Sequence, residues 1–145
     1  MIVKRGISGL QVDQLIKFTG KDELIEKFTH DSHRFKNPSN YKKWQKGKTI
    51  YTLIDKKGNL LGVIWFGKKK NPQVPDYPYT FAIRVYPPTR GKGHALKFMK
   101  EAFKNFKPNG VWLTTHIENI PAIKLYKKFG FKELACKADE LTMAL

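Results

Sequence analysis

The sequence is short of cysteine and of long apolar stretches. Its 145 residues contain a single cysteine, Cys136, which excludes an internal disulfide and a zinc site built from cysteines. No apolar run approaches the roughly 20 residues that a membrane-spanning helix requires. The charged residues near Met1 are followed by no apolar stretch of the kind that a secretory signal needs. We therefore expect a cytoplasmic protein that holds no metal ion and enters no membrane.

Acidic residues are also scarce. The sequence has 12 Asp and Glu against 28 Lys and Arg, which gives a formal net charge of +16. Such an excess is typical of proteins that bind polyanions such as nucleic acids. However, 24 of the basic residues are Lys, spread along the chain, and only 4 are Arg, which nucleic-acid readers prefer for bidentate contacts. We favour an ordinary basic surface, and a nucleic-acid partner remains the alternative.

The length and the 41% of hydrophobic residues fit one domain, residues 1–145, with a single sizeable core. Apolar periodicity, capping residues and turn residues predict its elements. Strands are expected at residues 2–5, 49–54, 60–66, 80–85, 111–115, 131–136 and 141–145. Helices are expected at residues 8–20, 22–28, 41–45, 91–106 and 119–129, and residues 29–40 form a polar, turn-rich segment. This order predicts an α/β or α+β layer fold.

The turn that joins the fourth expected strand to the next helix, residues 86–95, reads Tyr-Pro-Pro-Thr-Arg-Gly-Lys-Gly-His-Ala. A glycine-bearing turn that opens a helix exposes backbone N–H groups, which suit a phosphate. It is not a P-loop, because Gly93 stands where Ser or Thr is required. It is not a dinucleotide fingerprint, because Leu96 stands where a small residue is required. Taken alone, the turn is either a phosphate site or an ordinary tight connection.

A second motif follows at residues 119–131, Asn-Ile-Pro-Ala-Ile-Lys-Leu-Tyr-Lys-Lys-Phe-Gly-Phe. It predicts a short helix that starts at Asn119 and ends at Gly130. Tyr126 lies on its apolar face. By periodicity alone this face is an ordinary core stripe with a buried tyrosine.

The two motifs in this order resemble the GNAT superfamily of acyl-CoA-dependent N-acyltransferases. In that family an Arg/Gln-x-x-Gly-x-Gly/Ala turn follows a strand that ends in an apolar-x-Val-x-Pro pattern. Residues 90–95 and 83–87 match these two patterns. The family's later Asn-x-x-Ala-x-x-Leu-Tyr-x-x-x-Gly-Phe pattern is matched by residues 119–131. The resemblance is sharp over residues 79–131, and it implies a GNAT fold: a central, mixed, mostly antiparallel sheet with helices on both faces.

The resemblance also implies that acetyl-CoA is a co-substrate. The backbone of the turn would hold its pyrophosphate, and the strand before the turn would offer backbone groups to its pantetheine arm. Asn119 would contact that arm. The residues expected to bind the cofactor are Ile83, Val85, Arg90, Gly91, Lys92, Gly93, His94, Ala95, Asn119 and Tyr126.

By the same resemblance, Tyr126 would donate a proton to the leaving thiolate, while backbone N–H groups of residues 83–85 would stabilise the oxyanion. Many relatives carry a Glu near the start of the strand before the turn, where this sequence has Tyr79 and Thr80. That strand has no acidic residue. Glu118 is our candidate base, although its charge also suits the start of a helix. The alternatives are His116, Asp76 or His33 acting through water, or an amine that arrives neutral.

We therefore expect a GNAT-fold N-acetyltransferase that transfers an acetyl group from acetyl-CoA to a primary amine by direct attack. Two alternatives stay open: an acyltransferase that acts on an RNA-borne or protein amine, and a catalytically silent module that binds CoA or nucleic acid. The acceptor is expected to be a small molecule or peptide that binds between residues 29–45 and the final hairpin. Either a monomer or a homodimer is consistent with the sequence. Cys136 is expected to be a small core residue rather than an acyl carrier.

Overall fold

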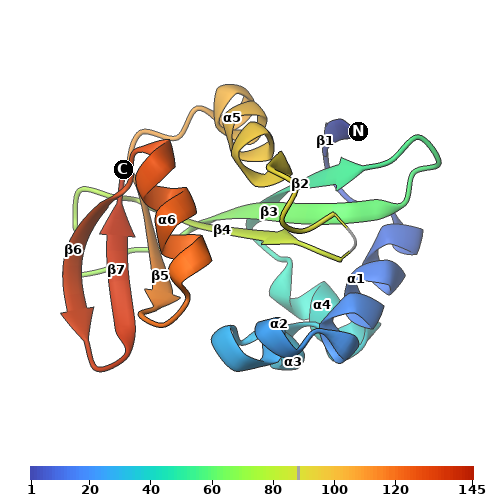
Figure 1. The fold of residues 1–145 in the computed structure, drawn as a ribbon, viewed down its shortest axis with the longest axis horizontal. Helices are drawn as coiled ribbons and strands as arrows, with labels where there is room; N and C mark the ends of the chain where they lie inside the picture. The colour runs from blue at the N-terminus through green and yellow to red at the C-terminus, as the bar shows by residue number, and fades with distance from the viewer. Residues whose placement is uncertain (88) are drawn as a thin grey trace.

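A seven-stranded sheet organises the chain (Figure 1). The computed structural model describes residues 1–87 and 89–145. The strands are β1 (Ile2–Arg5), β2 (Lys48–Ile54), β3 (Leu60–Lys68), β4 (Tyr79–Val85), β5 (Val111–His116), β6 (Lys132–Lys137) and β7 (Glu140–Ala144). The helices of the described residues are α1 (Gly9–Lys21), α2 (Glu23–Phe28), α3 (Asp31–Arg34), α4 (Pro38–Trp44), α5 (His94–Phe106) and α6 (Ile120–Phe129).

The strand order across the sheet is β1-β2-β3-β4-β5-β7-β6. Every neighbouring pair is antiparallel except β4 and β5, which are parallel. The expected mixed, mostly antiparallel sheet is therefore confirmed. None of the helices in the described part of the chain has the length and apolar character that spanning a membrane requires.

Local sequence signals account for most helix boundaries. Ser8 and Gln11 form a reciprocal capping box at the start of α1. The Asp22 side chain accepts hydrogen bonds from two backbone N–H groups at the start of α2. Asn37 caps α4, and Pro38 occupies its first turn, where a missing N–H costs nothing. These caps fix where the first helices begin and so which of their faces meets the sheet.

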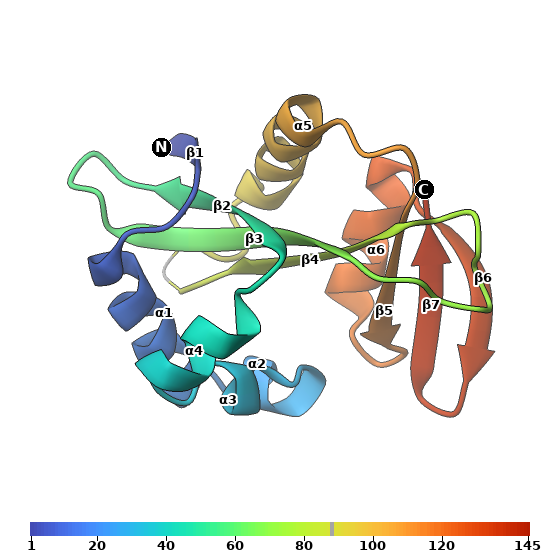
Figure 2. The same ribbon diagram turned by 180° about the vertical axis from the view of Figure 1, so that it is seen from behind.

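The two faces of the sheet carry separate cores because strand residues alternate between them. On one face Ile64 and Phe66 pack with α5 and α6. On the other, Val63 and Trp65 pack against residues of α1, α2 and α4. Figures 1 and 2 show α1–α4 gathered on one side of the first four strands and α5 on the other. The expected placement of helices on both faces is confirmed.

Several element boundaries differ from the sequence-based expectation. The segment expected to be turn-rich holds α3 and the first half of α4. The helix expected from residue 91 starts at His94, because Gly91 and Gly93 both have φ of 79°. Cys136 was wrongly expected in the core; it is exposed, as is the rest of β6. This strand lies at the edge of the sheet, and only its partner β7 buries an apolar face.

The sheet opens between β4 and β5. These strands pair only at their first residues, Tyr79 with Val111 and Thr80 with Trp112. Beyond Thr80 the two strands diverge, and in Figure 1 β5, β7 and β6 run at a steep angle to β2–β4. The divergence leaves the second half of β4 without a neighbouring strand on its β5 side, at the centre of the molecule.

Candidate active site

The start of α5 is an open cradle of backbone N–H groups. Gly93 is its N-cap residue, and among the described residues no side-chain capping hydrogen bond is made there. A Cβ atom added at Gly91 or Gly93 would meet nothing within 4 Å. The two glycines therefore border open space, and the N–H groups of the first turn lie at the positive end of a 13-residue helix. This geometry suits a diphosphate bound through the backbone.

Arg90, just before the cradle, is held by the protein itself. Its Nε donates to the Val85 carbonyl at 3.1 Å, and its guanidinium forms a bidentate ion pair with the carboxylate of Asp22. Burial raises the pKa of Asp22, but hydrogen bonding and attraction from Arg90 and two backbone N–H groups outweigh it, so that pKa is lowered. Arg90 thus ties the cradle to the start of α2. Lys92 is exposed beside it.

The remaining residues expected at the cofactor lie on β4, at the start of α5 and at the start of α6. Ile83 is buried and Val85 half-buried on β4, whose backbone groups face the gap toward β5. Asn119 is the N-cap residue of α6, and its side chain makes no capping hydrogen bond. His94 and Ala95 form the first turn of α5.

Tyr126 lies on α6 beside that opening. Its side chain is buried, with ring centroids 5.8 Å from Phe131 and 6.4 Å from Phe81. Burial raises the pKa of the Tyr126 phenol, and the nearby Arg84 only partly offsets this. The phenol therefore stays protonated at neutral pH and is suited to donate a proton rather than to accept one.

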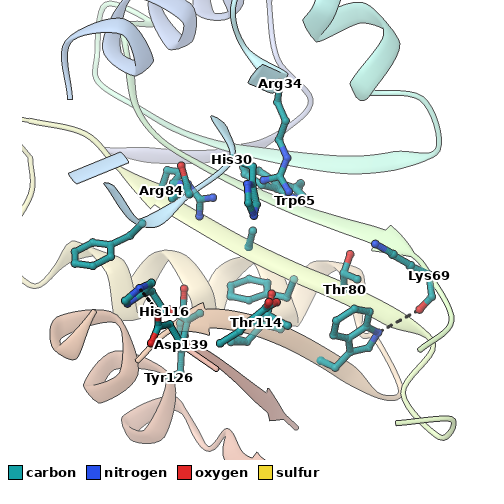
Figure 3. Close-up of a pocket in the computed structure, with 18 of the residues that line it drawn as sticks. His30, Arg34, Trp65, Lys69, Thr80, Arg84, Thr114, His116, Tyr126 and Asp139 are labelled. Atoms are coloured by element: carbon teal, nitrogen blue, oxygen red, sulfur yellow. Dashed lines mark hydrogen bonds and ion pairs between the residues drawn. The ribbon is translucent and has the colours of Figure 1, made fainter. Parts of the chain in front are cut away.

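A cleft of about 650 Å³ lies between the α2–α4 side of the molecule and the β6–β7 hairpin. In Figure 3, His30 and Arg34 project into it from one wall, and Tyr126, His116 and Asp139 from the other. Strand β4 forms its floor, because its residues on the α1–α4 face are small or polar. The cleft meets the opening between β4 and β5 at Tyr126. An acceptor bound in the cleft would reach the opening at Tyr126 from one side, and a thioester bound between β4 and β5 would reach it from the other.

Strand β4 carries one charged residue, Arg84, and no acidic one. Arg84 donates from Nε to Asp31 Oδ2 at 2.6 Å and from Nη2 to Asp31 Oδ1 at 3.2 Å. Arg34 donates to the same Oδ1 at 3.2 Å. Asp31 is fully buried, so two guanidinium groups neutralise one carboxylate inside the cleft wall. This group of three side chains therefore keeps one net positive charge beside the cleft.

The candidate bases occupy different places. Glu118 is exposed after β5 and does not line the cleft, and neither do the exposed Asp76 and His33. His116 does line it. Its Nδ1 accepts a hydrogen bond from the Glu118 N–H at 3.1 Å, while Nε2 lies 4.0 Å from Asp139 Oδ2. An accepting Nδ1 leaves the neutral ring protonated at Nε2. His116 is thereby arranged as a donor toward Asp139.

Three features of the cleft were missed from the sequence: the ion pairs of Asp31, the aromatic wall formed by Trp44 and Trp65, and the imidazole of His30. The side chain of His30 makes no hydrogen bond to the described residues, and it faces the middle of the cleft beside β4 (Figure 3). The one available signal was Arg84, the single charged residue of a mostly apolar strand. Its partner is 53 residues away, so local patterns could not identify it.

Comparison with known proteins agrees with this geometry. A family model described as the acetyltransferase (GNAT) family matches residues 19–131 of the chain. This range includes α2–α4, the α5 cradle and the whole of the later motif at residues 119–131. No curated protein matches the chain.

Solved structures share the fold at low sequence identity. The spermidine N-acetyltransferase of Vibrio cholerae, in complex with CoA and spermine, superposes with a TM-score of 0.71 at 17% identity, over 99% of this chain and 94% of that one. The smu.2055 protein of Streptococcus mutans gives a TM-score of 0.75 at 17% identity, over 100% and 98%. A chimera of the Vibrio cholerae enzyme SpeG with hSSAT gives 0.71 at 16%, over 100% and 95%. Identities this low establish the fold alone.

Proposed function

The chain belongs to the GNAT acetyltransferase family, and from this premise we propose that its cleft acetylates the primary amine of an acceptor that enters between α3 and the β6–β7 hairpin. Members of this family are acetyl-CoA-dependent N-acetyltransferases. The observation that carries the proposal is the uncapped, open start of α5 beside a sheet that parts at Thr80, with Tyr126 at the junction. A cofactor groove and an acceptor cleft meet there.

Acetyl-CoA supplies the acetyl group as a thioester when it is bound. We assign its diphosphate to the backbone N–H groups of residues 91–95 and its pantetheine arm to the unpaired edge of β4. The amine nitrogen attacks the carbonyl carbon, and the carbon–sulfur bond breaks. Tyr126 gives its proton to the departing sulfur, and the attacking amine loses one proton to a base. Backbone N–H groups of β4 on the open side stabilise the negative charge on the carbonyl oxygen.

We assign the base to His30. Its imidazole faces the cleft next to the floor formed by β4, and no hydrogen bond to the described residues holds either ring nitrogen. His116 is the weaker candidate, because accepting a proton at Nδ1 would break its hydrogen bond from the Glu118 N–H. Positive charge from Arg84 assists the attack by the amine, because it favours the neutral form of an amine that lies nearby. The reaction then needs no carboxylate on β4.

The test compares two matched variants, His30→Gln and His116→Gln. CoA release is followed by thiol detection over a range of pH with a panel of primary amines. We expect His30→Gln to lower kcat/KM by about 10²-fold and to change the acidic limb of the pH profile. His116→Gln should lower it by less than about tenfold, with the limb unchanged. Equal losses in both variants would contradict the assignment of the base, and no CoA release with any amine would refute the proposed function.

A polyamine such as the spermine bound by the Vibrio cholerae relative is a poor match for the charge of this cleft. Spermine is a polycation, whereas the cleft here is lined by six Lys and Arg side chains and only two acidic ones. Amine acetylation is therefore proposed without a polyamine acceptor.

A further inference from the structure

Four positive side chains gather in the acceptor cleft: Arg34, Lys48, Lys69 and Arg84, here called the cationic cluster. Both guanidinium groups lie over the ring of Trp65, Arg84 at 4.9 Å and Arg34 at 5.9 Å from its centroid. Lys48 Nζ lies 4.6 Å from the centroid of Trp44, and Trp44 packs edge-on against Trp65 at 4.8 Å. Three of the four side chains thus lie on one aromatic wall, and Lys69 lines the same cleft.

This cluster has too few counter-charges. Its one carboxylate is that of Asp31, which is shared by Arg34 and Arg84. Within the described residues, neither Lys48 nor Lys69 forms an ion pair. Burial and repulsion from Arg34 and Lys69 lower the pKa of Lys48, so the charges act on one another. The two acidic residues that line the cleft, Asp139 and Glu140, lie on the hairpin wall.

The cofactor phosphates do not account for the cluster. The cradle at residues 90–95 contributes no residue to the cleft. The cluster comes from α3, the start of β2, the segment after β3 and β4, all on the acceptor side of the opening. Like charges placed together without an ion reduce stability, and proteins keep such arrangements where a ligand supplies the opposite charge.

Arg34 is the member best placed to hold an anion. Its side chain is one-third exposed and points into the cleft (Figure 3). In the part of the chain that the structure describes, only Nη1 of its guanidinium has a hydrogen-bond partner, which is Asp31. The remaining N–H groups are available as a fork, which matches the two oxygens of a carboxylate or phosphate.

We propose that the acceptor is a small amine that also carries an anionic oxygen group, a carboxylate or a phosphate, bound by Arg34 with Lys48 and Lys69. This inference rests on the proposed acetyl transfer. The anion sits against the cluster, and the amine end points along β4 toward His30 and Tyr126. Diamines and polyamines are disfavoured, because their second ammonium group would lie among the lysines.

The experiment compares acceptors of matched length and different charge: β-alanine, β-alaninamide and diaminopropane, then other amino acids with their amides. Phosphoethanolamine against ethanolamine distinguishes a phosphate from a carboxylate. Each pair is measured as kcat/KM for CoA release and as thermal stabilisation in the presence of CoA. We expect kcat/KM for the best anionic acceptor to exceed that for its amide by about 10- to 100-fold, which is the range of a charge-assisted bidentate contact.

Substitutions in the cationic cluster test which side chains produce the preference for an anionic acceptor. Arg34→Met should reduce the ratio of kcat/KM for the anionic acceptor to kcat/KM for its amide to near one. Lys69→Met should reduce the same ratio, and its side chain forms no hydrogen bond or ion pair within the described residues, so its loss leaves the fold intact. Lys70→Met is the matched control, since Lys70 is exposed and does not line the cleft. It should leave the ratio unchanged.

The outcomes separate this inference from the proposed function. Turnover with equal or greater preference for amides or diamines overturns the anionic acceptor and leaves acetyl transfer standing. Failure of every anionic amine to stabilise the protein more than its amide also overturns it. Charge-selective binding without acetyl transfer to any amine supports the anion site and refutes the proposed function.

Discussion

Tyr126→Phe tests the proposed proton donor with the smallest change of structure. The variant keeps the ring between Phe81 and Phe131 and removes only one hydroxyl group. No cavity is created, so the free energy of unfolding should change by less than about 0.5 kcal/mol. Any large loss of activity is then a loss of chemistry.

The expected loss is about 10²-fold in the rate of the chemical step, which corresponds to about 2.7 kcal/mol of transition-state stabilisation. The raised pKa of Tyr126 gives a second expectation. Because a raised pKa keeps the phenol protonated at higher pH, its ionisation should not produce a fall in rate below about pH 10. The wild-type alkaline profile should therefore be flat up to that pH, and Tyr126→Phe should lower the profile without changing its shape.

The assay is single-turnover acetyl transfer at saturating acceptor, in which product release does not limit the rate. Tyr79→Phe is the matched control. Tyr79 is half-buried against Phe106 at 5.2 Å and does not line the cleft. A single-turnover rate for Tyr126→Phe within about threefold of that for Tyr79→Phe would refute the role of the phenol as the acid and leave it a packing residue.

Two further predictions concern the cradle and its tie to α2. Gly93→Glu should abolish the thermal stabilisation of the protein by CoA. Gly58→Glu is the control and should keep this stabilisation, because Gly58 lies in the β2–β3 turn with φ of 84° and equally open surroundings. Equal stabilisation of the two variants by CoA would disprove the site. Asp22→Asn keeps a helix-capping side chain but loses the charge that pairs with Arg90, at a cost of about 1 kcal/mol in the free energy of unfolding at neutral pH. Because folding lowers the pKa of Asp22, this difference in stability between wild type and variant is present above the pKa of the unfolded state and vanishes as the pH falls through the pKa of the folded state. Urea denaturation of both proteins at neutral pH and near pH 3 measures it. A stability difference that persists in acid would contradict the ion pair.

The strand, turn and helix start of the proposed cofactor site were predictable because their signals are local. A phosphate cradle needs only a strand end, a turn that allows positive φ and a helix start, and residues 86–95 contain all three. The helix of residues 120–129 is likewise marked at one end by Asn119 and at the other by Gly130. The exact start of α5 was missed, because the sequence does not reveal that both Gly91 and Gly93 adopt the left-handed conformation.

The order of elements also determined the fold class. Alternating strands and amphipathic helices, together with the hairpin signal at residues 55–59, predict a layered sheet with helices on both faces. The exposure of Cys136 was not predictable from its own segment. Burial of an edge strand depends on which element covers it, and nothing in residues 131–137 shows that β6 lies at the edge.

The acceptor side was decided by tertiary structure alone. Asp31 and Arg84 are 53 residues apart and meet because α3 packs across β4. Lys48 and Lys69 reach the same wall through the register that pairs Lys48 with Gly67. Each of these side chains reads in the sequence as one more basic or acidic surface residue. Their charges become a site only when the fold brings them within reach of one another, since electrostatic interaction depends on distance and burial in space, whereas a sequence motif records only distance along the chain.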